Sequence, residues 1–173
     1  GYVNGKREPA IHRIRASYEL AGPADATPTE ATLERPARGD AAADERTFAL
    51  PDDGDALSAW MGEYLGYGVD LVHDPNGGFP DDRAAPGPTV ISRETLRTVA
   101  SWFDGIADAS EARRRFRPNV VLADGPAFWE DRLFDDHGVG VRAAVGDAEL
   151  LGINPCQRCV VPSRHPDTGA ELD

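Results

Sequence analysis

The stretch that decides the fold is "GINPCQRCVVPSRHPDTG", Gly152–Gly169, which holds both cysteines of the 173-residue chain. Cys156 and Cys159 are separated by two residues, and prolines stand on both sides of the pair. Such a pair serves as a redox disulfide, as half of a zinc site, or as a source of one thiolate ligand for a soft metal. Two buried thiols that only pack are a fourth alternative.

The residues around the cysteines favour the single thiolate. A redox pair of the thioredoxin kind begins a helix, but β-branched residues and prolines follow Cys159, so no helix is expected there. A structural zinc site takes four ligands, and His137 and His165 would have to complete it. The guanidinium of Arg158 places positive charge beside the pair, which suits a thiolate. All four alternatives remain open on these residues alone.

The segments upstream of the cysteines predict a β-rich chain with two or three helices. Apolar periodicity and capping residues predict helices, and alternating or continuous apolar runs predict strands. A Gly146–Asp147 turn predicts a hairpin directly before the cysteines. The expected helices span residues 55–65, 93–103 and 110–116, and the expected strands include residues 31–34, 46–50, 69–74, 89–92, 119–124 and both arms of that hairpin.

These elements do not alternate regularly as β-α-β, so we expect an α+β, β-rich fold that is barrel-like. The long loop Pro75–Pro88 is the predicted boundary between two parts, residues 1–80 and 87–173. Trp60 and Trp102 lie on predicted helix faces and are expected in the core. The aromatic pair Phe128 and Trp129 is expected to pack there as well, or to cover the hairpin.

The charge of the chain excludes some partners. A net charge of −12, with a single lysine, argues against nucleic acid, and no apolar stretch is long enough to cross a membrane. Two cysteines are too few for a disulfide scaffold and fit a reducing cytoplasm. Dispersed acidic residues indicate adaptation to high salt, as in a halophilic archaeon, and an ordinary acidic protein is the alternative.

The chain resembles the MOSC domain, the C-terminal domain of molybdenum-cofactor sulfurases. The resemblance lies in "RFRPNVVL", Arg115–Leu122, followed some thirty residues later by the cysteine stretch. "GPTVISRETLRTV", Gly87–Val99, resembles the strand and helix before that motif. Residues 1–80 resemble the last part of the family's N-terminal β-barrel domain, and residues 87–173 its MOSC core. The resemblance therefore implies a MOSC-type β-barrel fold in a chain truncated at both ends.

The resemblance also implies a site. Cys159 matches the family's molybdenum-ligating cysteine, whereas Cys156 matches a position that need not be a ligand. Arg117 and Asn119 match residues that contact the pterin of the molybdenum cofactor (molybdopterin). Further implied contacts to the cofactor come from Gln157, Arg158, Thr89 and Ser92.

A function follows from the same resemblance. It implies a molybdenum-dependent oxidoreductase that reduces N-hydroxylated small molecules with electrons from a ferredoxin- or flavin-type partner protein. The alternative is a carrier or sulfurase-type domain that binds or delivers the cofactor, or holds sulfur, without redox turnover. The residues themselves add one physical argument: in a chain this acidic, the arginines around Arg117 are the natural place for an anionic cofactor.

Overall fold

The computed structural model of the chain describes residues 2–22, 25–72, 87–135 and 140–172. The elements group into two compact units. The first consists of Gly1–His73 with His165–Ala170, and the second of Asp74–Arg164 with Glu171–Asp173. Each unit has a hydrophobic core of its own.

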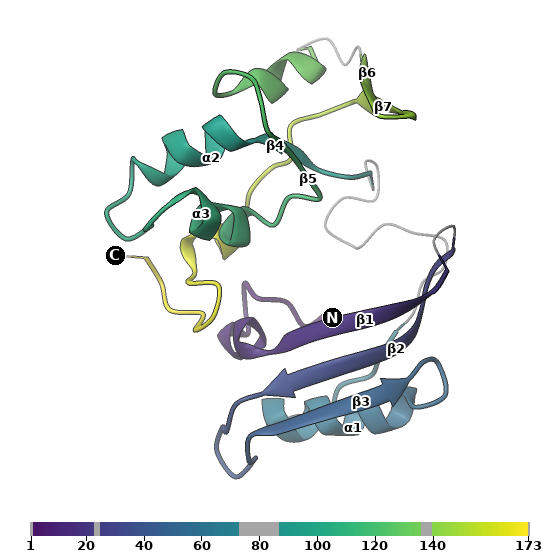
Figure 1. The fold of residues 1–173 in the computed structure, drawn as a ribbon. Coiled ribbons are helices and arrows are strands. Elements are labelled where there is room, and N and C mark those ends of the chain that lie inside the picture. Colours follow the sequence, from purple (N-terminus) through teal and green to yellow (C-terminus); the bar gives the residue numbers. More distant parts are fainter. Residues whose placement is uncertain (1, 23–24, 73–86, 136–139, 173) are drawn as a thin grey trace. The chain divides into compact units, whose positions relative to one another are not determined.

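The first unit is an antiparallel sheet with one long helix (Figure 1). Its strands are β1 (Arg15–Gly22), β2 (Asp25–Arg35) and β3 (Asp44–Ala49), in the order β1-β2-β3. A short 3-10 helix, η1 (Pro9–Arg13), precedes the sheet, and α1 (Gly54–Leu65) follows it. The sequence predicts only residues 31–34 of β2, because the Pro- and Thr-rich part of that strand has no apolar alternation.

The core of this unit lies between the sheet and α1. Ala31 and Leu33 point inward from β2 at the two-residue spacing of a strand, and Phe48 joins them from β3. Trp60 of α1 meets Phe48 edge to face, with ring centroids 5.9 Å apart. Burial of these apolar groups is what joins the helix to the sheet.

The boundaries of α1 follow the sequence prediction. Gly66 ends the helix with a φ of 83°, a left-handed conformation that glycine adopts without steric cost. The strand that we expected at residues 69–74 is not formed over residues 69–72, and residues 73 and 74 lie outside the described part of the chain. The apolar residues of that segment were therefore an insufficient signal for a strand.

The second unit contains a short parallel pair of strands and two helices (Figure 1). Strand β4 (Val90–Ser92) pairs in parallel with β5 (Val120–Leu122), from Val90 opposite Val120 to Ser92 opposite Leu122. The chain between them forms α2 and α3, and a separate antiparallel hairpin, β6-β7, precedes the cysteines. The elements are β4 (Val90–Ser92), α2 (Arg93–Ala100), α3 (Ala109–Phe116), β5 (Val120–Leu122), β6 (Val141–Val145) and β7 (Ala148–Gly152), with 3-10 helices η2 (Trp129–Leu133) and η3 (Val161–Ser163).

The core of the second unit joins β4 to both helices through Ile91, Leu96, Ala112 and their apolar neighbours. The prediction that Trp102 belongs to this core is wrong. α2 ends at Ala100, so Trp102 follows the helix and leaves 60% of its surface exposed. The sequence pattern predicted that this helix continues to residue 103, about one turn beyond its observed end at Ala100.

The architecture confirms the α+β class. Among the described residues, the sheets have three, two and two strands, and none closes into the barrel that the resemblance implies. A barrel requires that strands far apart in the sequence pair continuously around a ring. Such pairing leaves no pattern within any short segment of the sequence. The predicted loop Pro75–Pro88 lies mostly outside the described residues, as does His137. No helix in the described ranges is long and apolar enough to cross a membrane.

Candidate functional site

Two of the predicted site residues lie side by side at the amino-terminal ends of the parallel strands. Thr89 precedes β4 and Asn119 precedes β5. The backbone N–H and the hydroxyl of Thr89 both donate to Asn119 Oδ1, at 2.9 and 3.1 Å, and the Asn119 N–H donates to the Thr89 carbonyl at 3.1 Å. These contacts fix the Asn119 amide, whose NH₂ group has no hydrogen-bond partner among the described residues.

Arg117 lies two residues before Asn119, at the end of α3. A residue that precedes proline is ordinarily extended, but Arg117, which precedes Pro118, has φ 52° and ψ 46°. Its N–H donates to the Arg113 carbonyl at 2.8 Å, so the left-handed conformation terminates the helix. The side chain is exposed and has neither an ion pair nor a hydrogen bond within the described ranges.

Arg158, between the two cysteines, is held at the same end of α3. Its guanidinium donates to the Phe116 carbonyl at 3.1 Å and lies over the Phe116 ring, 5.5 Å from the centroid. A cation is favourable there, because the last carbonyls of a helix carry partial negative charge. The structure thus brings Arg158 beside the residue that precedes Arg117, although 41 positions separate the two arginines in sequence.

Arg115 is a positioning residue that the sequence interpretation missed. It is 3% exposed, and its Nε and NH2 groups donate to Glu111 Oε1 at 2.8 and 2.6 Å. Its NH1 group donates to the carbonyl of Pro162, three residues after Cys159, at 3.3 Å. α3 therefore anchors the chain on both sides of Cys159, at Arg158 and, through Arg115, at Pro162. The four-residue spacing of Glu111 and Arg115 could have indicated their ion pair, but not the contact with Pro162.

Both thiols are free and exposed. Residues 155–159 form no helix, so neither cysteine stands at the helix N-terminus that a redox pair of the thioredoxin kind uses. This disfavours a redox pair. The neighbouring Gln157 is exposed as well.

The zinc alternative has no support in the described part of the chain, where no three His, Cys, Asp or Glu side chains gather as metal ligands. His165 instead forms a turn, in which its Nδ1 accepts the Asp167 N–H at 3.2 Å. The other histidine of that alternative, His137, belongs to the residues that the structure does not describe.

Ser92 is not brought together with Thr89. It lies at the opposite end of β4, about 10 Å along the strand, and is 1% exposed. Its hydroxyl accepts the Thr95 N–H at 3.0 Å and bonds the Thr95 hydroxyl at 2.7 Å, which makes it the N-cap of α2. The sequence predicts this cap correctly.

The remaining predicted residues have a definite chemical character. Among the described residues, Cys159 offers an exposed soft thiol, and Arg117 and Asn119 offer a guanidinium and an NH₂ group without partners, which are groups that suit a metal and an anion. This donor set fits a cofactor that carries a soft metal, a phosphate and a pterin.

The sequence of the chain is similar to that of a mitochondrial protein. Mitochondrial amidoxime-reducing component 1 of Danio rerio is 26% identical to the chain over 188 aligned residues, which cover 96% of the chain. The chain spans 55% of the length of that relative. No family model matches the chain, and no solved structure matches it. The similarity covers nearly the whole chain and supports a relationship with MOSC-like proteins.

Proposed function

We propose that the chain belongs to a molybdenum-cofactor-binding oxidoreductase that reduces N-hydroxylated small molecules with electrons from a ferredoxin- or flavin-type protein partner. The observation that carries the proposal is the anchoring of the cysteine loop. Arg158 and Arg115 fix it to the end of α3, where Arg117 terminates the helix. The similarity to an amidoxime-reducing component supports the reaction class.

In this proposal each residue has its own task. Cys159 binds the metal, Arg117 and Arg158 offset the negative charge of the cofactor, and Asn119, held by Thr89, donates to its pterin. Gln157 contributes from the loop between the cysteines. The cofactor, when bound, supplies the two-electron chemistry, and the protein supplies ligation, orientation and electrostatics. Free thiols fit a reducing compartment, so we place the protein in the cytoplasm.

A second candidate function rests on the exposure of both thiols. A carrier or sulfurase-type domain would hold sulfur as a persulfide on Cys156 or Cys159, or would deliver the cofactor without turnover. Such a role needs a thiol that a partner can reach, and both thiols meet this condition within their own unit.

Metal analysis of matched cysteine variants tests the proposal. The protein, expressed with its full natural sequence in a molybdenum-replete host, is expected to contain about one molybdenum per chain, since one thiolate ligates one metal. Cys159→Ala should lose the metal, and Cys156→Ala, the matched control three residues away, should keep it. Zinc in place of molybdenum, no metal at all, or equal loss in both variants would contradict the proposal.

An activity assay then separates the enzyme from the carrier. Protein that is fully loaded with molybdenum is reduced with an artificial electron donor and given an amidoxime. Formation of the amidine supports the oxidoreductase, because removal of the oxygen requires turnover at the metal. A loaded protein that produces no amidine favours the carrier.

A further inference from the structure

Two segments of the second unit contain arginines but no acidic residue. The chain as a whole has 30 acidic and 18 basic residues, yet residues 112–123 and 150–164 hold neither aspartate nor glutamate. Six arginines lie in these two segments: Arg113, Arg114, Arg115, Arg117, Arg158 and Arg164. A region that attracts an anionic partner is therefore expected where these segments lie.

The fold brings the two segments together at the end of α3. Arg158 donates to the Phe116 carbonyl at 3.1 Å, and Arg115 donates to the Pro162 carbonyl at 3.3 Å. In addition, η3 packs against α3 (Figure 1). Segments that are separate in the sequence thus form one positively charged region around the end of the helix.

Two of the six arginines are used inside the unit. Arg115 is buried and pairs with Glu111 at 2.6 Å. The side chain of Arg164 is 12% exposed and pairs with Glu171 at 3.2 Å. The other four are exposed and are here named the arginine face: Arg113, Arg114, Arg117 and Arg158.

The arginine face extends from α3 to the proposed metal ligand. The N–H of Arg117 donates to the Arg113 carbonyl at 2.8 Å. Cys159 follows Arg158 directly in the chain, so their Cα atoms lie about 3.8 Å apart. The proposed function assigns Arg117 and Arg158 to the anionic cofactor. It leaves Arg113 and Arg114 without a task, although they lie on the same end of the helix.

We propose that the arginine face is the docking surface for an acidic electron-donor protein of the ferredoxin type, and that Arg113 and Arg114 contact the carboxylates of that donor. With a net charge of −12, most of the chain repels an acidic protein, so the donor is attracted only where positive charge is concentrated. The arginine face thereby directs the donor toward Cys159. The inference rests on the proposed function, because only a redox enzyme needs an electron donor.

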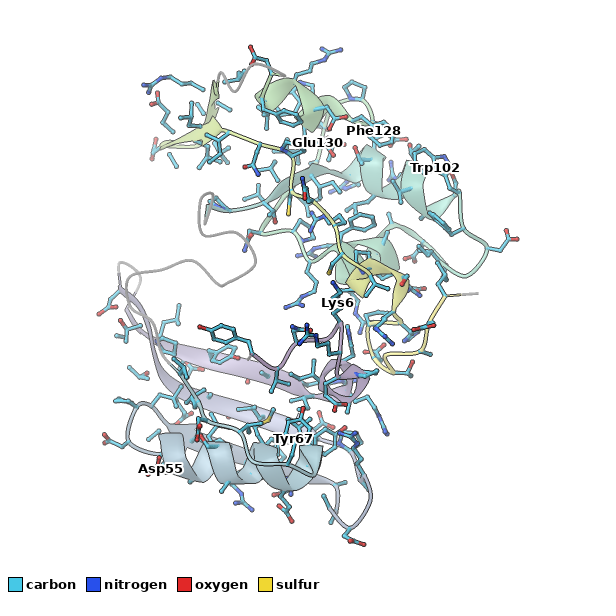
Figure 2. All side chains as sticks on the ribbon, turned by 180° about the vertical axis from the view of Figure 1, so that it is seen from behind. Lys6, Asp55, Tyr67, Trp102, Phe128 and Glu130 are labelled. Atoms are coloured by element: carbon cyan, nitrogen blue, oxygen red, sulfur yellow. The ribbon has the colours of Figure 1, made fainter. Side chains whose placement is uncertain are left out.

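A second exposed feature of this unit fits such a donor less well. Trp102 and Phe128, labelled in Figure 2, stack with ring centroids 5.7 Å apart and are 60% and 37% exposed. Exposed aromatic side chains often anchor partner proteins. Asp104 and Asp131, which are close to them in the sequence, are exposed carboxylates that would repel an acidic donor. The aromatic pair is therefore the alternative docking position that the test must distinguish.

Binding of an acidic [2Fe–2S] ferredoxin to the molybdenum-loaded protein tests the proposal. The protein has its full natural sequence, the ferredoxin carries a fluorescent label, and fluorescence anisotropy gives the dissociation constant at KCl concentrations from about 0.1 to about 1 M. In the double variant Arg113→Glu, Arg114→Glu we expect the dissociation constant at the lowest salt to rise at least about tenfold, because attraction becomes repulsion. The affinity of the wild-type protein should fall as KCl screens the charges.

A double variant of the same total charge is the matched control. Arg132→Glu, Arg142→Glu reverses two exposed arginines outside the acid-free segments and should change the dissociation constant less than about twofold. Equal losses in both double variants would show that total charge sets the affinity, and this overturns the proposal. A loss of affinity in Trp102→Ala but not in Arg113→Glu, Arg114→Glu places the donor on the aromatic pair and overturns it as well.

The outcomes separate this inference from the proposed function. A wild-type protein that contains no molybdenum overturns the proposed function and the inference with it. A loaded wild-type protein that does not bind the ferredoxin overturns the inference alone. Circular dichroism at each salt concentration verifies that the variants fold. If Arg113→Glu, Arg114→Glu does not fold, the neutral double variant Arg113→Gln, Arg114→Gln must raise the dissociation constant at least about threefold.

Discussion

Arg117 combines a charge and a backbone conformation that favour different residue types. Its left-handed φ of 52° ends α3, a position where glycine is the usual residue, and an arginine there accepts local strain. The guanidinium that it carries is exposed and unpaired within the described chain. A strained residue whose side chain has no partner in the described structure is typical of a functional position.

Arg117→Gly is therefore expected to separate stability from cofactor binding. Glycine relieves the left-handed strain, so the free energy of unfolding should stay equal or rise by about 1 kcal/mol. The same change removes a guanidinium from the anion site, so the molybdenum and pterin content should fall. Urea denaturation and metal analysis of the same preparations measure both effects.

Arg113→Ala is the control for this prediction, because Arg113 is exposed on α3, one turn before Arg117. It should keep both the stability and the cofactor within error. Loss of stability in Arg117→Gly without loss of cofactor would show that Arg117 serves the helix end rather than the site.

At the scale of elements, the sequence correctly predicted those features that interactions between residues close in the chain determine. Gly66 ends α1 and Ser92 caps α2 because each acts within one turn of its own helix, and Gly146 marks the β6-β7 hairpin for the same reason. Arg158 could be named as a site residue only by resemblance. Its contact with Phe116 joins segments 42 residues apart, and nothing in either segment encodes the other.

Arg115 also depends on a contact between distant segments, and here the sequence suggests an exposed residue where the structure has a buried one. Sequence shows a run of three arginines at the end of a helix, whose ordinary role is to complement the helix dipole in solvent. Burial of Arg115 between Glu111 and the Pro162 carbonyl depends on tertiary packing of α3 against η3. Such burial cannot be inferred from spacing alone, since its neighbours Arg113 and Arg114 remain exposed.

Arg115→Ala should destabilise the protein far more than loss of a surface ion pair. It leaves the Glu111 carboxylate, with a side chain only 17% exposed, without its buried partner. Breaking a buried pair from one side costs about 3–5 kcal/mol. Arg142→Ala, which breaks the exposed β6-β7 pair with Glu149, should cost under about 1 kcal/mol. Urea denaturation of both variants measures the difference, and equal costs would contradict the anchoring role of Arg115.

At the scale of the whole molecule, charge acts in two opposing directions. The net charge of −12 means that acidic side chains repel one another, and salt weakens this repulsion. Salt also weakens the exposed ion pairs, such as Arg15 with Glu34 and Arg142 with Glu149. The pairs are few and exposed, each contributing under about 1 kcal/mol, whereas the unbalanced acidic residues are distributed along the entire chain. Relief of repulsion should therefore dominate.

Thermal melting at increasing KCl concentration tests this balance and the proposed salt adaptation together. The screening length falls from about 10 Å at 0.1 M salt to about 3 Å at 1 M. The melting temperature should consequently rise steeply up to about 1 M KCl and more slowly above it. A matched series in sucrose, which strengthens burial without screening charge, identifies the electrostatic part of the rise. A melting temperature that is flat or falls with KCl would contradict salt adaptation, because the surface ion pairs would then outweigh the repulsion among the acidic residues.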